Sequence, residues 1–161
     1  MNEETRVDIH TPTQTLFNEL LQIETDTWEV YMIAARELGV TENELWILLD
    51  VASKEAEFCQ ADLARKLHIP AQTLNSALNK MTKKGWITLE PMKGSNKSKR
   101  IVLTEEGKRK AGPVVEQIHE AEMRAFGSLD HEQAVMMLTT IRLYLTRFTK
   151  EMNDLFSPNK D

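Results

Sequence analysis

Apolar side chains recur every three or four positions along most of the chain, which is the period of an amphipathic helix. The first such pattern predicts one long helix from about Thr13 to Leu38, and Gly39 is a typical C-terminal stop. Thr41, with Glu44 three residues later, then forms a capping box at the start of a second helix. Two shorter helical patterns follow, near 60–67 and over about 70–84 with Pro70 as the first helical residue.

After residue 85 the pattern alternates between apolar and polar positions, which is typical of strands. Ile87 and Leu89 alternate with polar residues, and so do Ile101 and Leu103, with a polar, basic stretch at 92–99 between them. This predicts a two-stranded antiparallel hairpin with a long basic loop.

Two further helices are expected after the hairpin. Thr104 is a candidate N-cap, and we expect a kink near Pro113, or a short turn and a fresh start, because proline lacks a backbone donor. Asp130 is expected to cap the last helix. Its apolar stripe has a heptad-like spacing that favours a coiled-coil seam, and it consists of Ala134, Leu138, Ile141, Leu145, Phe148, Met152 and Leu155.

The order helix, short helix, turn, helix, hairpin predicts a winged helix-turn-helix within a mainly α fold that has a small β-hairpin wing and a helical dimerisation region. We expect an N-terminal dimerisation helix over 1–38 and the winged region over 41–104, with the recognition helix at about 70–84 and the wing at about 86–103. The C-terminal dimerisation helices are expected over 105–157. The dimer interface predicted from the apolar stripes comprises Leu16, Leu20, Leu138, Ile141, Leu145, Phe148 and Met152.

The net charge of −5 over 161 residues argues at first against a nucleic-acid partner. Its distribution changes that conclusion. Residues 60–110 hold twelve basic and four acidic side chains, a charge of +8, and the remainder carries −13. A basic middle between acidic ends indicates a polyanion site on one part of the molecule.

The outer face of the helix expected over about 70–84 is rich in amides and hydroxyls, and the sequence contains no acid between Ala71 and Gly85. Such side chains meet base edges in the major groove, and lysines meet phosphates. The predicted DNA-binding residues are Gln72, Thr73, Asn75, Ser76, Asn79, Lys80, Lys83, Lys97, Lys99 and Arg100. The alternative for each of them is an ordinary solvated helix face or loop.

These segments resemble the MarR family of bacterial transcriptional regulators over nearly the whole chain. The resemblance lies in 44–48 (ELWIL), 60–67 (QADLARKL), 72–78 (QTLNSAL), 84–87 (KGWI) and 103–108 (LTEEGK). It implies an obligate dimer with interlocked terminal helices, a near-palindromic operator, repression, and release of DNA on binding a small ligand or on oxidation. The family often has Asp-x-Arg at the wing tip, where this chain has Ser95 and Lys97, so looser wing contacts or substitution by Arg100 are expected.

An effector pocket in this fold lies between the dimer helices and the winged region, and Trp28, Tyr31, Met32 and Trp46 are candidates to line it, with ordinary core packing as the alternative. The lone Cys59 excludes an intramolecular disulfide and is expected to be inert packing. His119 and Glu122 are a weak metal pair, so neither a metal nor a cofactor is predicted.

The sequence therefore predicts a homodimeric, ligand-responsive repressor that binds double-stranded DNA. It lacks a membrane span and a signal peptide, so a cytoplasmic location is the default expectation. The chief alternative is a winged helix that contacts only proteins. An enzyme is the third, and no catalytic constellation supports it.

Overall fold

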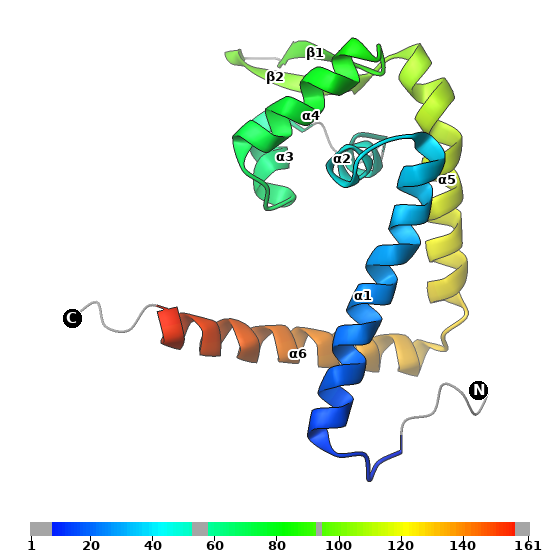
Figure 1. The fold of residues 1–161 in the computed structure, drawn as a ribbon, viewed down its shortest axis with the longest axis vertical. Coiled ribbons are helices and arrows are strands. Elements are labelled where there is room, and N and C mark those ends of the chain that lie inside the picture. The colour runs from blue at the N-terminus through cyan, green and yellow to red at the C-terminus, as the bar shows by residue number, and fades with distance from the viewer. Residues whose placement is uncertain (1–7, 53–57, 93–94, 157–161) are drawn as a thin grey trace. The chain divides into compact units, whose positions relative to one another are not determined.

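The computed structural model describes residues 8–52, 58–92 and 95–156. By its internal contacts the chain divides into two units, residues 1–116 and 117–161, and each is treated by itself. The elements, drawn in Figure 1, are α1 (Thr13–Leu38), α2 (Glu42–Ala52), α3 (Gln60–Lys66), α4 (Ala71–Lys83), β1 (Ile87–Met92), β2 (Ser95–Leu103), α5 (Glu105–Gly127) and α6 (His131–Phe156). The mainly helical winged helix-turn-helix fold is thus confirmed. None of the helices in the described ranges is both long and apolar enough to cross a membrane.

The turn between α1 and α2 follows the expected capping chemistry. Gly39 adopts a left-handed conformation with φ 60°, which costs glycine little because it has no Cβ. The backbone N–H of Thr41 donates to Glu44 Oε2 over 2.8 Å, and the N–H of Glu44 donates to Thr41 Oγ1 over 3.4 Å. The capping box is therefore formed, and it fixes where α2 begins.

The core of the first unit lies where α2, α3 and α4 pack against the base of the hairpin. Ile47, Leu48, Leu63 and Met81 have no exposed surface. The rest of this buried cluster comprises Leu74, Ala77, Leu78, Ile87, Ile101, Ala111 and Val115. Side chains from α2, α3, α4, both strands and the start of α5 thus share one apolar core.

The hairpin is longer than expected, and the prediction of a long loop at 92–99 is wrong. The two strands pair antiparallel from Ile87 opposite Leu103 to Met92 opposite Ser95, with an irregularity between Pro91 and Met92. An exposed ladder needs no apolar side chains to satisfy its backbone groups, so a polar, basic strand is not visible as one in the sequence. β2 also meets the chain before α3, since the N–H of Ile101 donates to the carbonyl of Phe58 over 3.2 Å.

Helix α5 begins at the expected cap but does not stop at its proline. The N–H of Gly107 donates to Thr104 Oγ1 over 3.0 Å. The helix then runs without interruption from Glu105 to Gly127 with Pro113 inside it, so the alternative of a short turn and a fresh start is wrong. Pro113 is exposed, and water can satisfy the carbonyl that loses its helical partner there.

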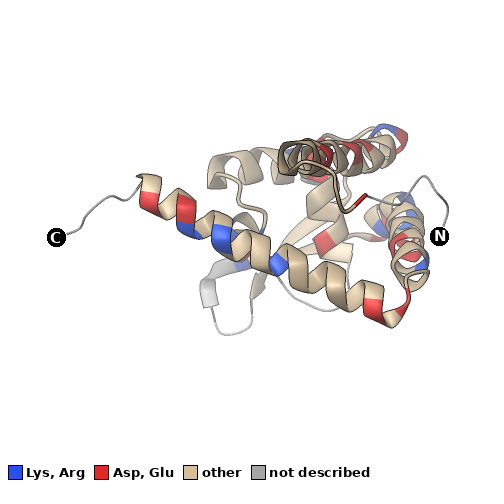
Figure 2. Cartoon of the chain, turned by 90° about the horizontal axis from the view of Figure 1, so that it is seen from below, with Lys and Arg blue, Asp and Glu red and all other residues tan. Residues whose placement is uncertain are grey.

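The second unit consists of the end of α5, from residue 117, and α6. The N–H of Asp130 donates to Gln133 Oε1 over 3.0 Å, and the N–H of Gln133 donates to Asp130 Oδ1 over 2.8 Å, which confirms the predicted cap. No residue of α6 is buried. In Figure 2 the half of α6 that follows its first turn is almost free of charged residues. Its apolar positions are therefore available to a partner.

The close approach of Gly107 to the backbone of Trp86 leaves no room for a side chain at position 107. A Cβ built there would collide with the carbonyl oxygen of Trp86 and lie 2.8 Å from its carbonyl carbon. Gly107→Ala should lower the free energy of unfolding by about 1–3 kcal/mol, the usual cost of overpacking. Gly112→Ala is the matched control in the same helix. Nothing lies within 4 Å of its added Cβ, so helix propensity should stabilise it by up to about 1 kcal/mol. Urea unfolding of both variants measures the difference, and equal effects would contradict the close contact at Trp86.

Candidate nucleic-acid interface

Helix α4 presents two chemically different faces. Leu74, Ala77, Leu78 and Met81 are buried, and they hold one side of the helix in the core. The opposite side is exposed at residues three and four positions apart, namely Gln72, Asn75, Ser76, Asn79, Lys80 and Lys83. The helix begins one residue later than expected, with Pro70 at the N-cap position.

The turn before α4 orients this helix relative to α3. His68 there has φ 52°, the only positive φ of a non-glycine residue among the described positions. This conformation is uncommon for a side chain with a Cβ, and nothing in the sequence pattern announces it. The tight turn brings α3 and α4 into contact, as a helix-turn-helix requires (Figure 1).

The predicted base-reading residues of α4 differ in their side-chain hydrogen bonds and in their exposure. In the described part of the chain, no hydrogen bond engages the side-chain amides of Gln72, Asn75 or Asn79. Ser76 Oγ donates to the carbonyl of Gln72 over 2.9 Å, so its proton is already used within the helix. Thr73 is half-buried. The three amides are therefore the best-placed groups for paired hydrogen bonds to a base edge.

The two basic residues of the wing whose side chains are described differ in exposure and in ion pairing. Lys99 is exposed, whereas Arg100 is half-buried and donates to Glu90 Oε2 over 2.7 Å, directly across the ladder. Arg100 is thus occupied in holding the hairpin together, and the expectation that it substitutes at the wing tip finds no support in its position. The side chain of Lys97 lies outside the described residues.

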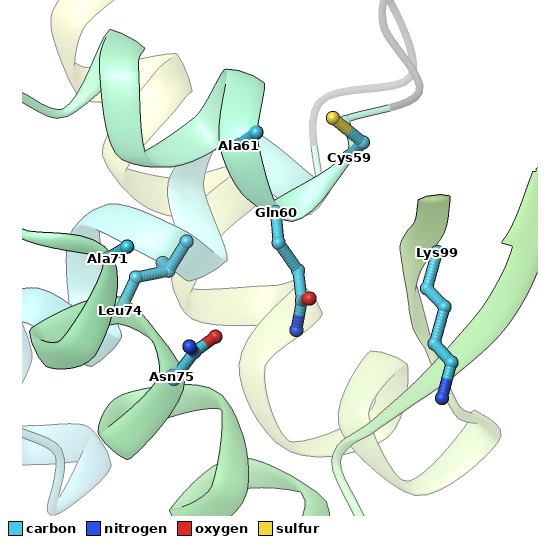
Figure 3. Close-up of a pocket in the computed structure, with 7 residues that line it drawn as sticks. All are labelled: Cys59, Gln60, Ala61, Ala71, Leu74, Asn75 and Lys99. Carbon is cyan, nitrogen blue, oxygen red and sulfur yellow. The ribbon is translucent and has the colours of Figure 1, made fainter. Parts of the chain in front are cut away.

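A cavity of about 250 Å³ lies between the start of α3, the start of α4 and the wing strand β2. Figure 3 shows the side chains of Gln60 and Asn75 extending into the space between α4 and the strand that carries Lys99. The sequence analysis placed Gln60 only at a helix start and did not name it as a candidate for the interface. The position of Gln60 depends on the change of backbone direction before α3, and no periodicity in the sequence reveals that change.

Cys59 is the N-cap of α3. Its thiol donates to Asp62 Oδ2 over 3.0 Å, and the N–H of Asp62 donates to Cys59 Sγ over 3.4 Å. The thiol hydrogen bond, helped by the positive charge of Arg65, lowers the pKa of the Asp62 carboxyl below its usual value. Cys59 therefore has a structural role at the start of this helix.

Three of the four residues predicted to line an effector pocket, Trp28, Tyr31 and Trp46, lie together, and Glu42, which the sequence analysis overlooked, joins them. The indole N–H groups of Trp28 and Trp46 both donate to Glu42 Oε1, over 2.9 Å and 3.3 Å. The rings of Tyr31 and Trp46 lie 4.8 Å apart between centroids. Met32 is buried. The spacing of Glu42 and Trp46, four residues apart on one helix, was the available signal.

The residues predicted to form a dimer interface carry exposed apolar surface. Leu16 is 39% exposed, and Leu20 is half-buried. On α6 the exposed positions include Leu138, Ile141, Leu145, Phe148 and Met152. Such a stripe on a single helix is typical of a surface that is covered by a partner.

A metal centre has no basis in the described residues, because no three His, Cys, Asp or Glu side chains form a suitable group there. His119 Nδ1 lies 3.8 Å from Glu122 Oε2, on the exposed surface.

Comparisons with known proteins show which fold the chain shares and which family model part of it matches. The MarR family model matches residues 38–94. A MarR family regulator from Neisseria meningitidis superposes with a TM-score of 0.69 at 15% identity, over 89% of this chain and 99% of that one. No curated protein matches the sequence.

Two similar structures were solved with ligands. A MarR family transcriptional regulator from Listeria monocytogenes, in complex with a 26mer DNA, has a TM-score of 0.64 and 17% identity over 97% of this chain and 99% of its own. Staphylococcus aureus MarR, in complex with salicylate and kanamycin, has a TM-score of 0.64 and 15% identity over 86% of this chain and 93% of its own. The MarR family model thus matches the winged helix-turn-helix segment, and the fold of MarR regulators is shared over most of the chain.

Proposed function

We propose that the chain is a homodimeric repressor that binds a near-palindromic operator through α4 and the wing, and that it releases DNA when a small molecule binds. One observation carries the DNA-binding part. The outward face of α4 has two exposed lysines, no acid, and three amide side chains without hydrogen-bond partners among the described residues. A helix of this chemistry suits the major groove, where amides pair with adenine and lysines with phosphates.

The DNA complex of the Listeria monocytogenes regulator supports this assignment, because that protein shares the fold along almost its whole length. The salicylate complex of Staphylococcus aureus MarR supports the ligand response in the same way. In this chain the cluster of Trp28, Tyr31, Trp46 and Glu42 is the proposed effector site. Its rings offer stacking surface, and its carboxylate fixes the two indoles.

Replacing a base-reading residue and replacing a phosphate-binding residue should reduce the affinity for DNA in different ways. Asn75→Ala should weaken binding to the operator by about 1–3 kcal/mol and leave binding to random DNA nearly unchanged, because one base contact is lost. Lys80→Ala should weaken binding to both DNAs alike and flatten the salt dependence, because one released counterion is lost. Operator fragments selected from genomic DNA by the purified protein supply the specific target. Titrations at several salt concentrations measure both effects, and equal losses on both DNAs for Asn75→Ala would remove it from base reading.

A protein that shifts no duplex DNA at low salt would instead support the protein-binding alternative.

The wing offers a second matched pair. Lys99→Ala should reduce the slope of log K against log salt by about 1, as expected for one phosphate contact. Arg100→Ala should leave that slope nearly unchanged and lower thermal stability, because the guanidinium is held by Glu90. The opposite pattern in salt titrations and thermal melts would make Arg100 the DNA contact.

The proposed dimer predicts a response to charge placed on the apolar stripe of α6. Leu145→Glu should shift the protein toward monomers, because the exposed apolar side chain would be replaced by a charge that is costly to bury. Thr139→Glu adds the same charge on the other side of the helix and is the control. Sedimentation at micromolar concentration distinguishes the two. In the proposed dimer the two recognition helices would lie about 34–36 Å apart, one helical turn of DNA. A native protein that is monomeric at micromolar concentration would overturn both the dimer and this spacing.

A further inference from the structure

A second cavity lies away from the amide face of α4, at the end of this helix. It has a volume of about 500 Å³, and its lining comprises Gly39, Val40, Thr41, Glu44, Lys80, Lys83 and Lys84. The first four belong to the turn between α1 and α2 and to the first turn of α2. Lys80 and Lys83 belong to the end of α4, and Lys84 is its C-cap residue. Its volume is in the range of small-molecule sites.

Glu44 brings a buried and incompletely paired carboxylate to this cavity. The residue is only 2% exposed. Its Oε2 accepts from the N–H of Thr41 over 2.8 Å and from Thr41 Oγ1 over 3.2 Å. Its Oε1 is buried and has no hydrogen-bond partner among the described residues. A buried acceptor without a partner is costly, so such an atom in a folded protein needs an explanation.

The three lysines give the cavity a cationic rim. Lys80 and Lys83 are exposed. Lys84 Nζ lies 3.5 Å from Glu44 Oε2, donates to the carbonyl of Gly39 over 3.3 Å, and sits 5.1 Å from the centroid of the Trp86 ring. Lys84 thus ties α4 to the turn before α2, which leaves Lys80 and Lys83 to attract an anion from solvent. Lysines in the last turn also suit the helix dipole, and that is the purely structural explanation of their presence.

A cavity that is lined by a buried hydrogen-bond acceptor and by ammonium groups selects an unusual anion. Its oxygens must accept from lysines, and it must also keep one proton to donate to Glu44 Oε1. A phosphomonoester meets both conditions, because its second pKa is about 6 and a protonated form is accessible near neutral pH. Sulfate and phosphodiesters lack that proton and would place negative charge against the carboxylate. We propose that this cavity binds the phosphate group of a small phosphomonoester, with Glu44 accepting its proton and Lys80 and Lys83 pairing with its oxygens.

Glu44 Oε1 is buried, so an incoming group must shift neighbouring side chains to reach it. Lys84 is suited to that movement, since its side chain is 36% exposed and its ion pair with Glu44 is long. The ammonium displaced from Glu44 would meet the anionic oxygens of the ligand. The ammonium group of Lys84 would thus exchange one anionic partner for another when the ligand enters.

The direct test is calorimetric titration of the full chain, without DNA, at constant ionic strength. The probes are phenyl phosphate and inorganic phosphate, against sulfate and dimethyl phosphate. The two protonatable phosphates should bind at least about tenfold more tightly, the usual effect of one hydrogen bond to a charged group. Equal affinity for phosphate and sulfate would overturn the proposal, and so would the absence of saturable binding, which would leave the lysines as helix-end charges only.

Glu44→Gln tests the selectivity by a gain of function. Glutamine keeps an oxygen for the capping box with Thr41, while its NH₂ group can donate to an oxyanion. This variant should bind sulfate as tightly as phosphate. Lys83→Gln should weaken both phosphates by about tenfold, whereas Lys110→Gln, an exposed lysine on α5, should not. An unchanged preference for phosphate in a Glu44→Gln protein with a native melting curve would contradict the role of Glu44. The native protein's own selectivity tests the site even if that variant fails to fold.

One consequence rests on the proposed function. Lys80 and Lys83 are also assigned to DNA phosphates, so an occupied cavity should compete with DNA. A mobility assay with and without phenyl phosphate tests this coupling. The titrations contain no DNA, so their outcome is independent of whether the protein binds an operator.

Discussion

The burial of one face of α4 is the constraint on which the rest of the winged region depends. Leu74, Leu78 and Met81 are almost without exposed surface and pack with side chains from α2, α3 and the strands. Because a helix has a fixed period, burying these positions forces Gln72, Asn75 and Asn79 outward. Rotating α4 would expose the apolar face and bury the amides without partners, so the core that stabilises the domain also presents its polar surface.

The end of α4 is connected to the wing and to α5 through Trp86. The N–H of Trp86 donates to the carbonyl of Met81 over 3.0 Å, and the carbonyl of Trp86 accepts from the N–H of Thr104 over 3.0 Å. Thr104 also donates its hydroxyl to the carbonyl of Gly85 and caps α5. Gly107 completes this junction by allowing the first turn of α5 to lie against the Trp86 backbone. A single residue thus fixes the base of the hairpin relative to the two helices around it.

The sequence predicts those parts of the structure that depend on local chemistry. Helix α1, the capping boxes at Thr41 and Asp130 and the glycine after α1 follow from period and propensity, which are properties of short segments. The errors arise where tertiary contacts decide. The polar residues at 95–99 belong to the hairpin because backbone pairing does not require apolar side chains. The need for glycine at position 107 is likewise set by a tertiary contact with the Trp86 backbone. The pairing of Arg100 with Glu90 depends on the register of the ladder, and the pairing of Trp28 with Glu42 depends on the packing of α1 against α2. Neither is encoded in a local pattern.

The ion pairs of the structure also refine the meaning of the basic middle segment. All four of its acids are paired within it, Asp62 with Arg65, Glu90 with Arg100, Glu105 with Lys108 and Glu106 with Arg109. Lys66 and Lys84 pair with acids of α2. Among the described residues of this segment, the lysines outside any ion pair are Lys80, Lys83, Lys99 and Lys110. Exposed pairs contribute little to stability, but they cancel the field of their members at a distance. The net positive charge therefore lies mainly at the end of α4 and on β2. These elements frame the exposed amides, and this arrangement favours a polyanion that lies along α4 and reaches the wing.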